Sequence, residues 1–469
     1  MCGVVGIVDK GGVSIRLYYA LYALQHRGRN STRMSTFDGN YLHSSRGYGL
    51  VADVYSPDKL FDLKGSIGVG NVRYPKFDGD TVENIEPLNF HFKKNIFSIV
   101  HDGNLVDWRE LRTEYEKTGV VLSTTSDTEI ISKILIEKIS NSKSIEDAIR
   151  STMQKLNGSY SIVMMINGIL YAFRDPLGIK PLCISKTENG YMVASESVAA
   201  DGLNAKFLRD VKPGELIRID TEGIRSTQIA VAERHAHCIF EFLYFCRIDS
   251  ILEGLSLYSL RLNIGKKLFD KEQIKADIVS PVPNGGTALA LGYSDQSQIP
   301  YCEGIMLNRY VDGVHLAPSL KIRAQILRAK FNPIPAHIKN KVVILVDDSI
   351  LGGTNSSYII KMMRDAGASE IHLRIGSPAI KAPCYLGVDL RSREKLLASK
   401  MDEKKVCRKM GATTLRYISL ETLIDAIKMH RDDFCVGCIT GCYPVKIDGE
   451  ISQLRKINFI DNTKQETIV

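Results

Sequence analysis

The chain has 469 residues, of which 44% are hydrophobic and 24% are charged, with a net charge of +8. These proportions are typical of a globular protein, and the length is sufficient for two or three domains. We find no run of about 18 apolar residues and no basic-then-apolar leader, so we expect a cytoplasmic protein that does not enter a membrane. The basic residues are dispersed, which argues against a nucleic-acid partner and favours anionic small molecules.

The chain begins with Cys2 and an apolar run, MCGVVGIVDKGG, which predicts a buried strand. If Met1 is removed, this residue carries both a thiol and a free α-amino group, whose pKa is ordinarily about 8. Such an amine can act as the general base for the thiol of the same residue. A structural cysteine in a first strand is the alternative.

Short apolar runs broken by Gly, Asn, Asp and Ser predict an α+β domain over roughly the first 230 residues. The clearest strands lie within residues 94–104 and 158–178. Helices are predicted over residues 16–25 and about 127–156, the second with Ser126 or Asp127 as its cap.

From about residue 275 the pattern changes to apolar strands that lead through small-residue loops into helices. The strands lie within residues 276–286, 341–355 and 370–378, and the helices begin near residues 287 and 355. Such alternation predicts a parallel sheet with ligands at the carboxyl ends of its strands.

One of these strands ends in two adjacent carboxylates, Asp347 and Asp348, in the segment VDDSILGGT. Two buried acids are costly unless they bind something, and these suit ribose hydroxyls or Mg²⁺ carried by a phosphate. The backbone N–H groups from Ser349 to Thr354 and the hydroxyls of these two residues can hold the phosphate itself.

The ordered motifs of the chain resemble those of the amidophosphoribosyltransferases over nearly its whole length. The matching segments are MCGVVGI, LQHRG, GNVRY, HDGNLVD, SDTE, GSYS, RDPLGIKPL, ASES, PGE, FEFLYFCRIDS, VPNGG, NRYV, VDDSILGGT, PCYLGVD and FCVGCITGCYP. The resemblance implies an α+β N-terminal-nucleophile (Ntn) glutamine amidotransferase domain, an αββα sandwich, over residues 1–232. It implies an α/β type I phosphoribosyltransferase domain with a parallel sheet over residues 233–469.

The resemblance also implies a reaction and the residues that perform it. Cys2 would attack the side-chain amide of glutamine, with the backbone N–H of Gly103 as an oxyanion donor and Arg73 and Asp127 holding the amino acid. The released ammonia would displace pyrophosphate from Mg²⁺-bound phosphoribosyl pyrophosphate (PRPP), as in purine synthesis, in a homo-oligomer. The substrate-binding positions implied are Arg27, Arg73, Asp127, Asp347, Asp348, Ser349 and Thr354.

A cysteine cluster near the C-terminus points to a metal cofactor. Cys435 and Cys438 form a C-x-x-C pair with the spacing of metal ligands, but alone they fall two ligands short. Some members of the family carry a [4Fe–4S] cluster held by four cysteines. The matching positions here are Cys238, Cys384, Cys435 and Cys438.

The first site departs from the family at Asp102, where HDGN replaces HNGN. An ionised carboxylate cannot donate to an oxyanion, and loss of one such donor costs about 10²–10³ in rate. Neighbouring motifs gain three bases, so we expect Asp102 to pair with Arg29, Arg33 or Lys76 in a rebuilt pocket.

The second site departs at the phosphate-binding loops. Gly352 replaces an arginine and Asn355 a threonine, the PDSG-like loop reads PNGG with Asn284 and Gly285, and NRYVDGVH lacks the arginine of the closing loop. Each lost arginine removes a bidentate partner for phosphate. Two alternatives therefore stay open: a specialised-metabolism enzyme that uses Cys2 on another amino acid or acyl donor with a different acceptor, and a non-catalytic or regulatory homologue.

Overall fold

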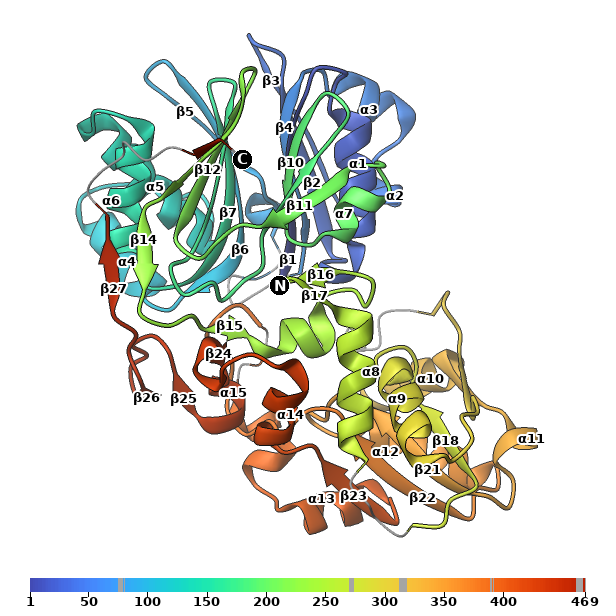
Figure 1. Cartoon of the computed structure of the whole chain (residues 1–469). Coiled ribbons are helices and arrows are strands. Elements are labelled where there is room, and N and C mark those ends of the chain that lie inside the picture. The colour runs from blue at the N-terminus through green and yellow to red at the C-terminus, as the bar shows by residue number, and fades with distance from the viewer. Residues whose placement is uncertain are drawn as a thin grey trace.

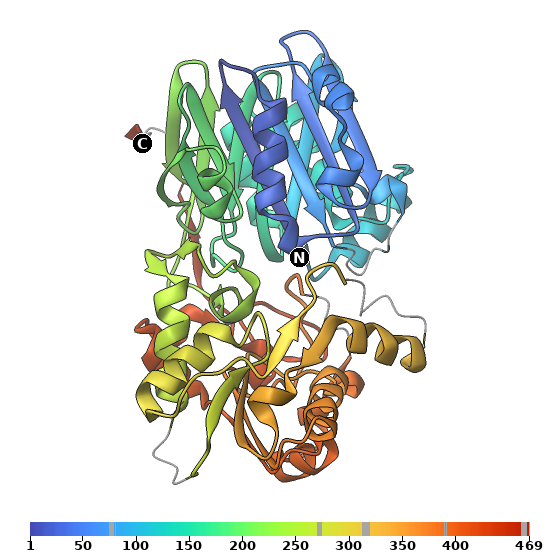
Figure 2. The ribbon, with the colours of Figure 1, turned by 90° about the vertical axis from the view of Figure 1, so that its right-hand side faces the viewer.

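The structure is a computed structural model that describes residues 1–74, 79, 81–269, 274–311, 319–388, 390, 392–460 and 467–468. Two domains lie one above the other, and the N-terminus is at their junction (Figures 1 and 2). Within the described residues, no helix is long and apolar enough to cross a membrane.

The first domain contains two seven-stranded antiparallel sheets, and helices cover their outer faces (Figure 1). A core that includes Val4, Val69, Val163 and Ala172 fills the space between the sheets, which confirms the αββα sandwich. The strands of the first sheet are, in order, β11 (Lys206–Asp210), β9 (Cys183–Lys186), β10 (Gly190–Ala194), β1 (Cys2–Asp9), β4 (Ile67–Arg73), β2 (Ser31–Phe37) and β3 (Leu42–Tyr48). Those of the second are β28 (Thr467–Ile468), β13 (Gly223–Gln228), β12 (Glu215–Asp220), β8 (Ile169–Arg174), β7 (Gly158–Ile166), β6 (Asn95–Leu105) and β5 (Leu88–Phe92).

The first domain has more helices than the two stretches that were predicted. The stretch predicted as one helix over 127–156 is two helices, because Ser144 caps a new one by accepting a hydrogen bond from the N–H of Asp147. Ser126 caps the first through the N–H of Thr128, as expected. The helices are α1 (Ser14–Ala23), α2 (Val51–Val54), α3 (Pro57–Asp62), α4 (Trp108–Lys117), α5 (Asp127–Asn141), α6 (Ile145–Lys155) and α7 (Val198–Asp201).

The second domain is built on a four-stranded parallel sheet, which confirms the α/β prediction. Its strands are, in order, β18 (Ile278–Pro281), β21 (Val342–Asp347), β22 (Glu370–Ile375) and β23 (Thr414–Tyr417). Its helices are α8 (Leu257–Leu268), α9 (Thr287–Ser297), α10 (Leu320–Lys330), α11 (Pro335–Ile338), α12 (Thr354–Asp365), α13 (Glu403–Met410), α14 (Leu420–Ile427) and α15 (Gly437–Thr440).

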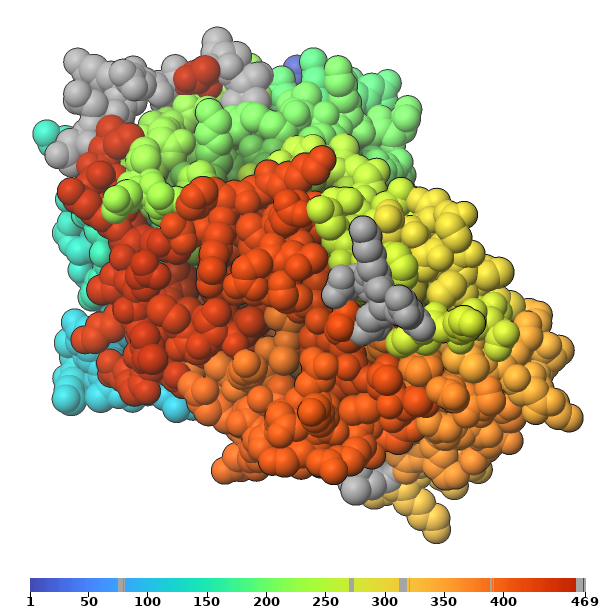
Figure 3. All heavy atoms as spheres, turned by 60° about the horizontal axis from the view of Figure 1, so that its bottom comes forward, coloured from blue at the N-terminus to red at the C-terminus, as the bar shows by residue number. Residues whose placement is uncertain are grey.

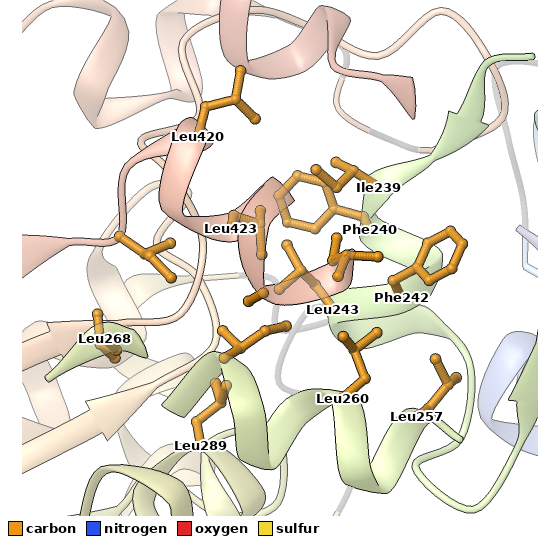
Figure 4. Close-up of a cluster of buried hydrophobic side chains, with 14 of the residues drawn as sticks. Ile239, Phe240, Phe242, Leu243, Leu257, Leu260, Leu268, Leu289, Leu420 and Leu423 are labelled. Carbon is orange, nitrogen blue, oxygen red and sulfur yellow. The ribbon is translucent and has the colours of Figure 1, made fainter. Parts of the chain in front are cut away.

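A π-helix, Glu241–Phe245, connects the domains and is anchored in the second one. Figure 4 shows Phe242 and Leu243 packed with Leu257 and Leu260 of α8 and with Leu423 of α14. This packing fixes the π-helix directly beneath the start of β1.

The C-terminal segment returns to the first domain. Strand β27 (Ile457–Phe459) pairs with β14 (Ala230–Ala232), and β28 adds the outermost strand to the second sheet. Figure 3 shows this red segment beside the cyan and green parts of the first domain. The division at residues 232 and 233 therefore stays a prediction, with a tail that crosses it. The remaining short strands are β15 (His237–Cys238), β16 (Ile251–Leu252), β17 (Leu255–Ser256), β19 (Ile305–Leu307), β20 (Phe331–Pro333), β24 (Phe434–Cys435), β25 (Cys442–Tyr443) and β26 (Ile451–Ser452).

Candidate active sites

Cys2 lies at the first position of β1, buried at the domain junction. It stands opposite Arg73 of β4 in the antiparallel ladder. Its N–H donates to Asp102 Oδ1 at 2.8 Å, and its carbonyl oxygen accepts from Arg27 Nε at 2.9 Å. The predicted nucleophile is thus held on both sides by charged side chains.

Arg27 is the centre of a buried charge network. Its Nη2 lies 3.0 Å from Asp102 Oδ2, and its Nη1 lies 2.7 Å from Glu196 Oε1 and 3.0 Å from Glu241 Oε2. Lys180 Nζ adds a contact of 3.1 Å to Glu241 Oε1. Burial alone would lower the pKa of Arg27, but the three carboxylates raise it well above its ordinary value. Burial raises the pKa of Glu196, but His26 and Arg27 outweigh it and lower that pKa to about 2.

Arg27, a residue predicted to bind substrate, is a base in direct contact with Asp102. The expected partners were the three new bases, and two of them can be located: Arg33 Nε donates to Ser44 Oγ at 2.9 Å, and Arg29 contributes to the electrostatic field at Tyr244. Lys76 lies outside the described residues. The pairing of Asp102 with one of the three new bases therefore stays a prediction, and Arg27 is a partner that it did not include.

Gly103 follows Asp102 on β6 with φ of +152°. A Cβ here would lie 2.0 Å from the carbonyl oxygen of Ser159 and 2.6 Å from His101 Nε2, so glycine is required. Asp127, at the start of α5, is tied to the same strand because its Oδ2 accepts from the N–H of Leu105 at 3.1 Å. Strand β6 therefore brings the predicted oxyanion donor beside the predicted amino-acid clamp.

Two further residues complete this neighbourhood. The guanidinium of Arg73 donates from Nη1 and Nη2 to the carbonyl oxygen of Gly79, each at 3.2 Å. Glu86, which the sequence analysis missed, is buried and accepts from the N–H of His101 at 2.9 Å and from Thr128 Oγ1 at 2.6 Å. Its segment carries no motif that would have identified it.

The second site lies at the carboxyl end of β21, as predicted. Burial raises the pKa of Asp347 well above its ordinary value, and Asp348 raises it further. Burial also raises the pKa of Asp348 to about 6, although Ser349 Oγ donates to its Oδ1 at 2.8 Å. Such a pair is prepared for a cation or hydroxyl ligand that would offset the cost of its charges.

The loops around this pair are closely fitted. A Cβ on Gly285 would lie 1.7 Å from Asp348 Oδ2, so the PNGG loop contacts the carboxylate directly. Thr354 opens α12, and Arg323 of α10 donates from Nη2 to Asn355 Oδ1 at 3.2 Å. The altered closing loop lies largely in residues 312–318, outside the described part of the chain.

Four predicted cysteine ligands come together between the domains. Cys238 of β15 stands opposite Cys435 of β24 in a parallel pair. Burial raises the pKa of Cys238 to about 12 and that of Cys438 well above its ordinary value, and Cys384 adds to both shifts. Within the described ranges, no group of three or more potential ligands is arranged around a single metal ion. A four-iron cluster presents several separate irons, so four neighbouring, half-buried thiols suit it in type.

The π-helix Glu241–Phe245 lies near both candidate sites. Tyr244 of the π-helix has a pKa raised to about 12, first by Asp348 and then by burial. Glu241, at the other end of the same π-helix, contacts Arg27. One short helix therefore faces both the carboxylate pair and the network around Cys2.

Comparison with known proteins agrees with this arrangement. Residues 79–201 match a family described as a glutamine amidotransferase domain. An amidophosphoribosyltransferase of Methanothermobacter thermautotrophicus is 41% identical over 96% of this chain and 96% of its own length. That of Bacillus subtilis is 36% identical over 95% and 94%. A solved structure of glutamine phosphoribosylpyrophosphate amidotransferase from B. subtilis, complexed with ADP and GMP, is 35% identical and superimposes with a TM-score of 0.89 over 96% of this chain and 99% of that one. The chain belongs to the amidophosphoribosyltransferase family.

Proposed function

We propose that this protein transfers the amide nitrogen of glutamine to PRPP, giving phosphoribosylamine, glutamate and pyrophosphate. One observation carries the proposal: in a chain with this family relationship, Cys2 faces Arg73 in one site and Asp347 and Asp348 end β21 in the other. Random loss of function would be expected to erode such residues together with the loops.

In the first stage, the thiol proton of Cys2 passes to its α-amino group and the sulfur attacks the amide carbon of glutamine. The backbone N–H of Gly103 supports the oxyanion, while Arg73 and Asp127 hold the carboxylate and amino group of the amino acid. The amine returns its proton to the departing nitrogen, and water then releases glutamate from the thioester.

In the second stage, ammonia attacks C1 of PRPP, the bond from C1 to the pyrophosphate oxygen breaks, and the nitrogen loses a proton. Asp347 and Asp348 hold the ribose hydroxyls, and the loop from Ser349 to Thr354 surrounds a phosphate. Mg²⁺ bound with PRPP would supply positive charge for the leaving pyrophosphate.

We further propose that Cys238, Cys384, Cys435 and Cys438 hold a structural [4Fe–4S] cluster, supported by their mutual electrostatic proximity. A cytoplasmic homo-oligomer is proposed as well. Exposed Ile15, Tyr19 and Tyr22 on one face of α1 support self-association, because clustered apolar side chains commonly mark interfaces.

The test compares glutamine-dependent with ammonia-dependent release of pyrophosphate from PRPP. Cys2→Ala should abolish the first and retain the second, since only the first needs the nucleophile. Cys183→Ala, at a buried cysteine of β9 to which neither reaction stage gives a role, is the matched control. Absence of PRPP-dependent pyrophosphate release with either nitrogen source in the unaltered protein would refute the proposal. Glutamate release without PRPP consumption would indicate a different acceptor.

A further inference from the structure

Asp102 occupies a position where a hydrogen-bond donor was expected, and its geometry gives it a different task. It comes from β6 of the second sheet and reaches the first residue of β1 in the first sheet, so it bridges the two halves of the sandwich. Its Oδ1 accepts from the nitrogen of Cys2 at 2.8 Å, and its Oδ2 accepts from Arg27 Nη2 at 3.0 Å. Both oxygens are thus engaged by donors on the protein itself.

The charged groups around Asp102 decide what this contact means. Within the described residues, Arg27, Lys180 and Glu241 act on it electrostatically, and Glu196 and His26 lie beyond Arg27. Arg27 is shared among Asp102, Glu196 and Glu241, and Lys180 contacts Glu241. The guanidinium therefore does not neutralise Asp102 alone, and the carboxylate keeps negative charge to offer the nitrogen of Cys2.

We propose that Asp102 is a positioning residue for the α-amino group of Cys2, which it holds as the proton acceptor for the thiol of the same residue. This rests on the proposed function, since the nitrogen becomes an amine only once Met1 is removed. Asp102 stays ionised while the proton moves from Sγ to the nitrogen and on to the departing amide nitrogen. An ion pair between the ammonium and Asp102 favours that transfer.

The arrangement also accounts for the loss of the family's side-chain amide. The lost oxyanion donor slows the attack, whereas a stronger base beside the thiol assists it. Support of the oxyanion passes to the backbone N–H of Gly103, whose conformation is fixed by the contacts of β6.

The test is the pH dependence of kcat/KM for glutamine hydrolysis in the full-length protein. A neighbouring carboxylate raises the pKa of an amine, so removal of its charge lowers it, and the amine then loses its proton at lower pH. Asp102→Asn should therefore shift the acidic limb of the profile to lower pH by at least about 1 unit. Asp9→Asn is the control: Asp9 is equally buried, lies at the far end of β1 and bonds to Thr187 Oγ1.

A shift confined to Asp102→Asn supports the proposal, and a profile that is unchanged or equally shifted in both variants overturns it. If Asp102→Asn does not fold, the unaltered protein decides: an acidic midpoint at or above about 8, the ordinary value for an α-amine, supports the inference, and a lower one overturns it. Failure of the proposed function would appear differently, as no glutamine hydrolysis by the unaltered protein at any pH.

Discussion

Glu196 joins the two domains through a single carboxylate, and its charge can be removed without a change of size. Its Oε1 contacts Arg27 and His26 in the first domain, each at 2.7 Å. Its Oε2 accepts from the N–H of Arg247 at 2.7 Å and from Ser250 Oγ at 2.8 Å, both beyond residue 232. Glu196→Gln keeps an acceptor for the second pair of contacts and loses the charge that serves the first.

The expected cost follows from the pKa of Glu196, which His26 and Arg27 lower from 4.5 to about 2 on folding, although burial opposes the shift. This fall corresponds to about 3 kcal/mol of stability at neutral pH. Since the folded-state pKa is depressed, the stability that the charge of Glu196 contributes is complete above about pH 4.5 and is lost as the pH falls through about 2. The penalty of Glu196→Gln should therefore shrink to about 2 kcal/mol at pH 3.5.

The assay is urea unfolding at both pH values, followed by the fluorescence of Trp108, the single tryptophan, which lies in the first domain. Glu188→Gln serves as the control, because Glu188 is exposed between β9 and β10. A penalty below about 1 kcal/mol at pH 7 would refute the reasoning, as would an equal penalty at the two pH values.

Two further outcomes are expected at the other sites. Gly285→Ala should raise the KM for PRPP at least about tenfold and leave glutamine hydrolysis unchanged, because the new Cβ would displace Asp348. Gly202→Ala, whose Cβ would meet no atom within 4 Å, should have little effect, and equal effects of the two variants would contradict this. Protein purified without oxygen should contain about four irons per chain, measured by colorimetric iron and sulfide assay, and Cys435→Ser should lose most of them. Cys442→Ser, at a nearby thiol outside the proposed set, should retain them; iron-free unaltered protein would count against the cluster.

Local patterns identified the strands with the longest apolar runs and the helices that follow them in the second domain. Apolar strands followed by small-residue loops gave the parallel sheet, and the strand ending in Asp347 lies where expected, because such runs need burial on both faces. The break between α5 and α6 was missed although residues 141–144 are polar, since the apolar spacing continues on both sides. Strand β28 was missed because it is defined by its distant partner β13.

In the candidate sites, too, local motifs were found and contacts between distant residues were missed. Cys2, Asp347 and Asp348 stand out because their motifs are contiguous in sequence. The contacts of Glu196 and Glu241 with Arg27 could not be found from the sequence, because 169 and 214 residues separate the partners. The motifs ASES and FEFLYFCRIDS contain both acids, but nothing in them states which base they meet. The contact of Arg27 with Asp102 was not predicted for the same reason, because 75 residues separate the two.

The last strands of the chain have a practical consequence for anyone who wishes to dissect this protein. A fragment ending at residue 232 would expose the open edge of β13 and leave β14 unpaired. Such a fragment would be prone to aggregate through this edge. A usable excised domain would need the terminal segment grafted back through a linker after β14. The C-terminal strands are thus a structural part of the first domain and must be included in any fragment of it.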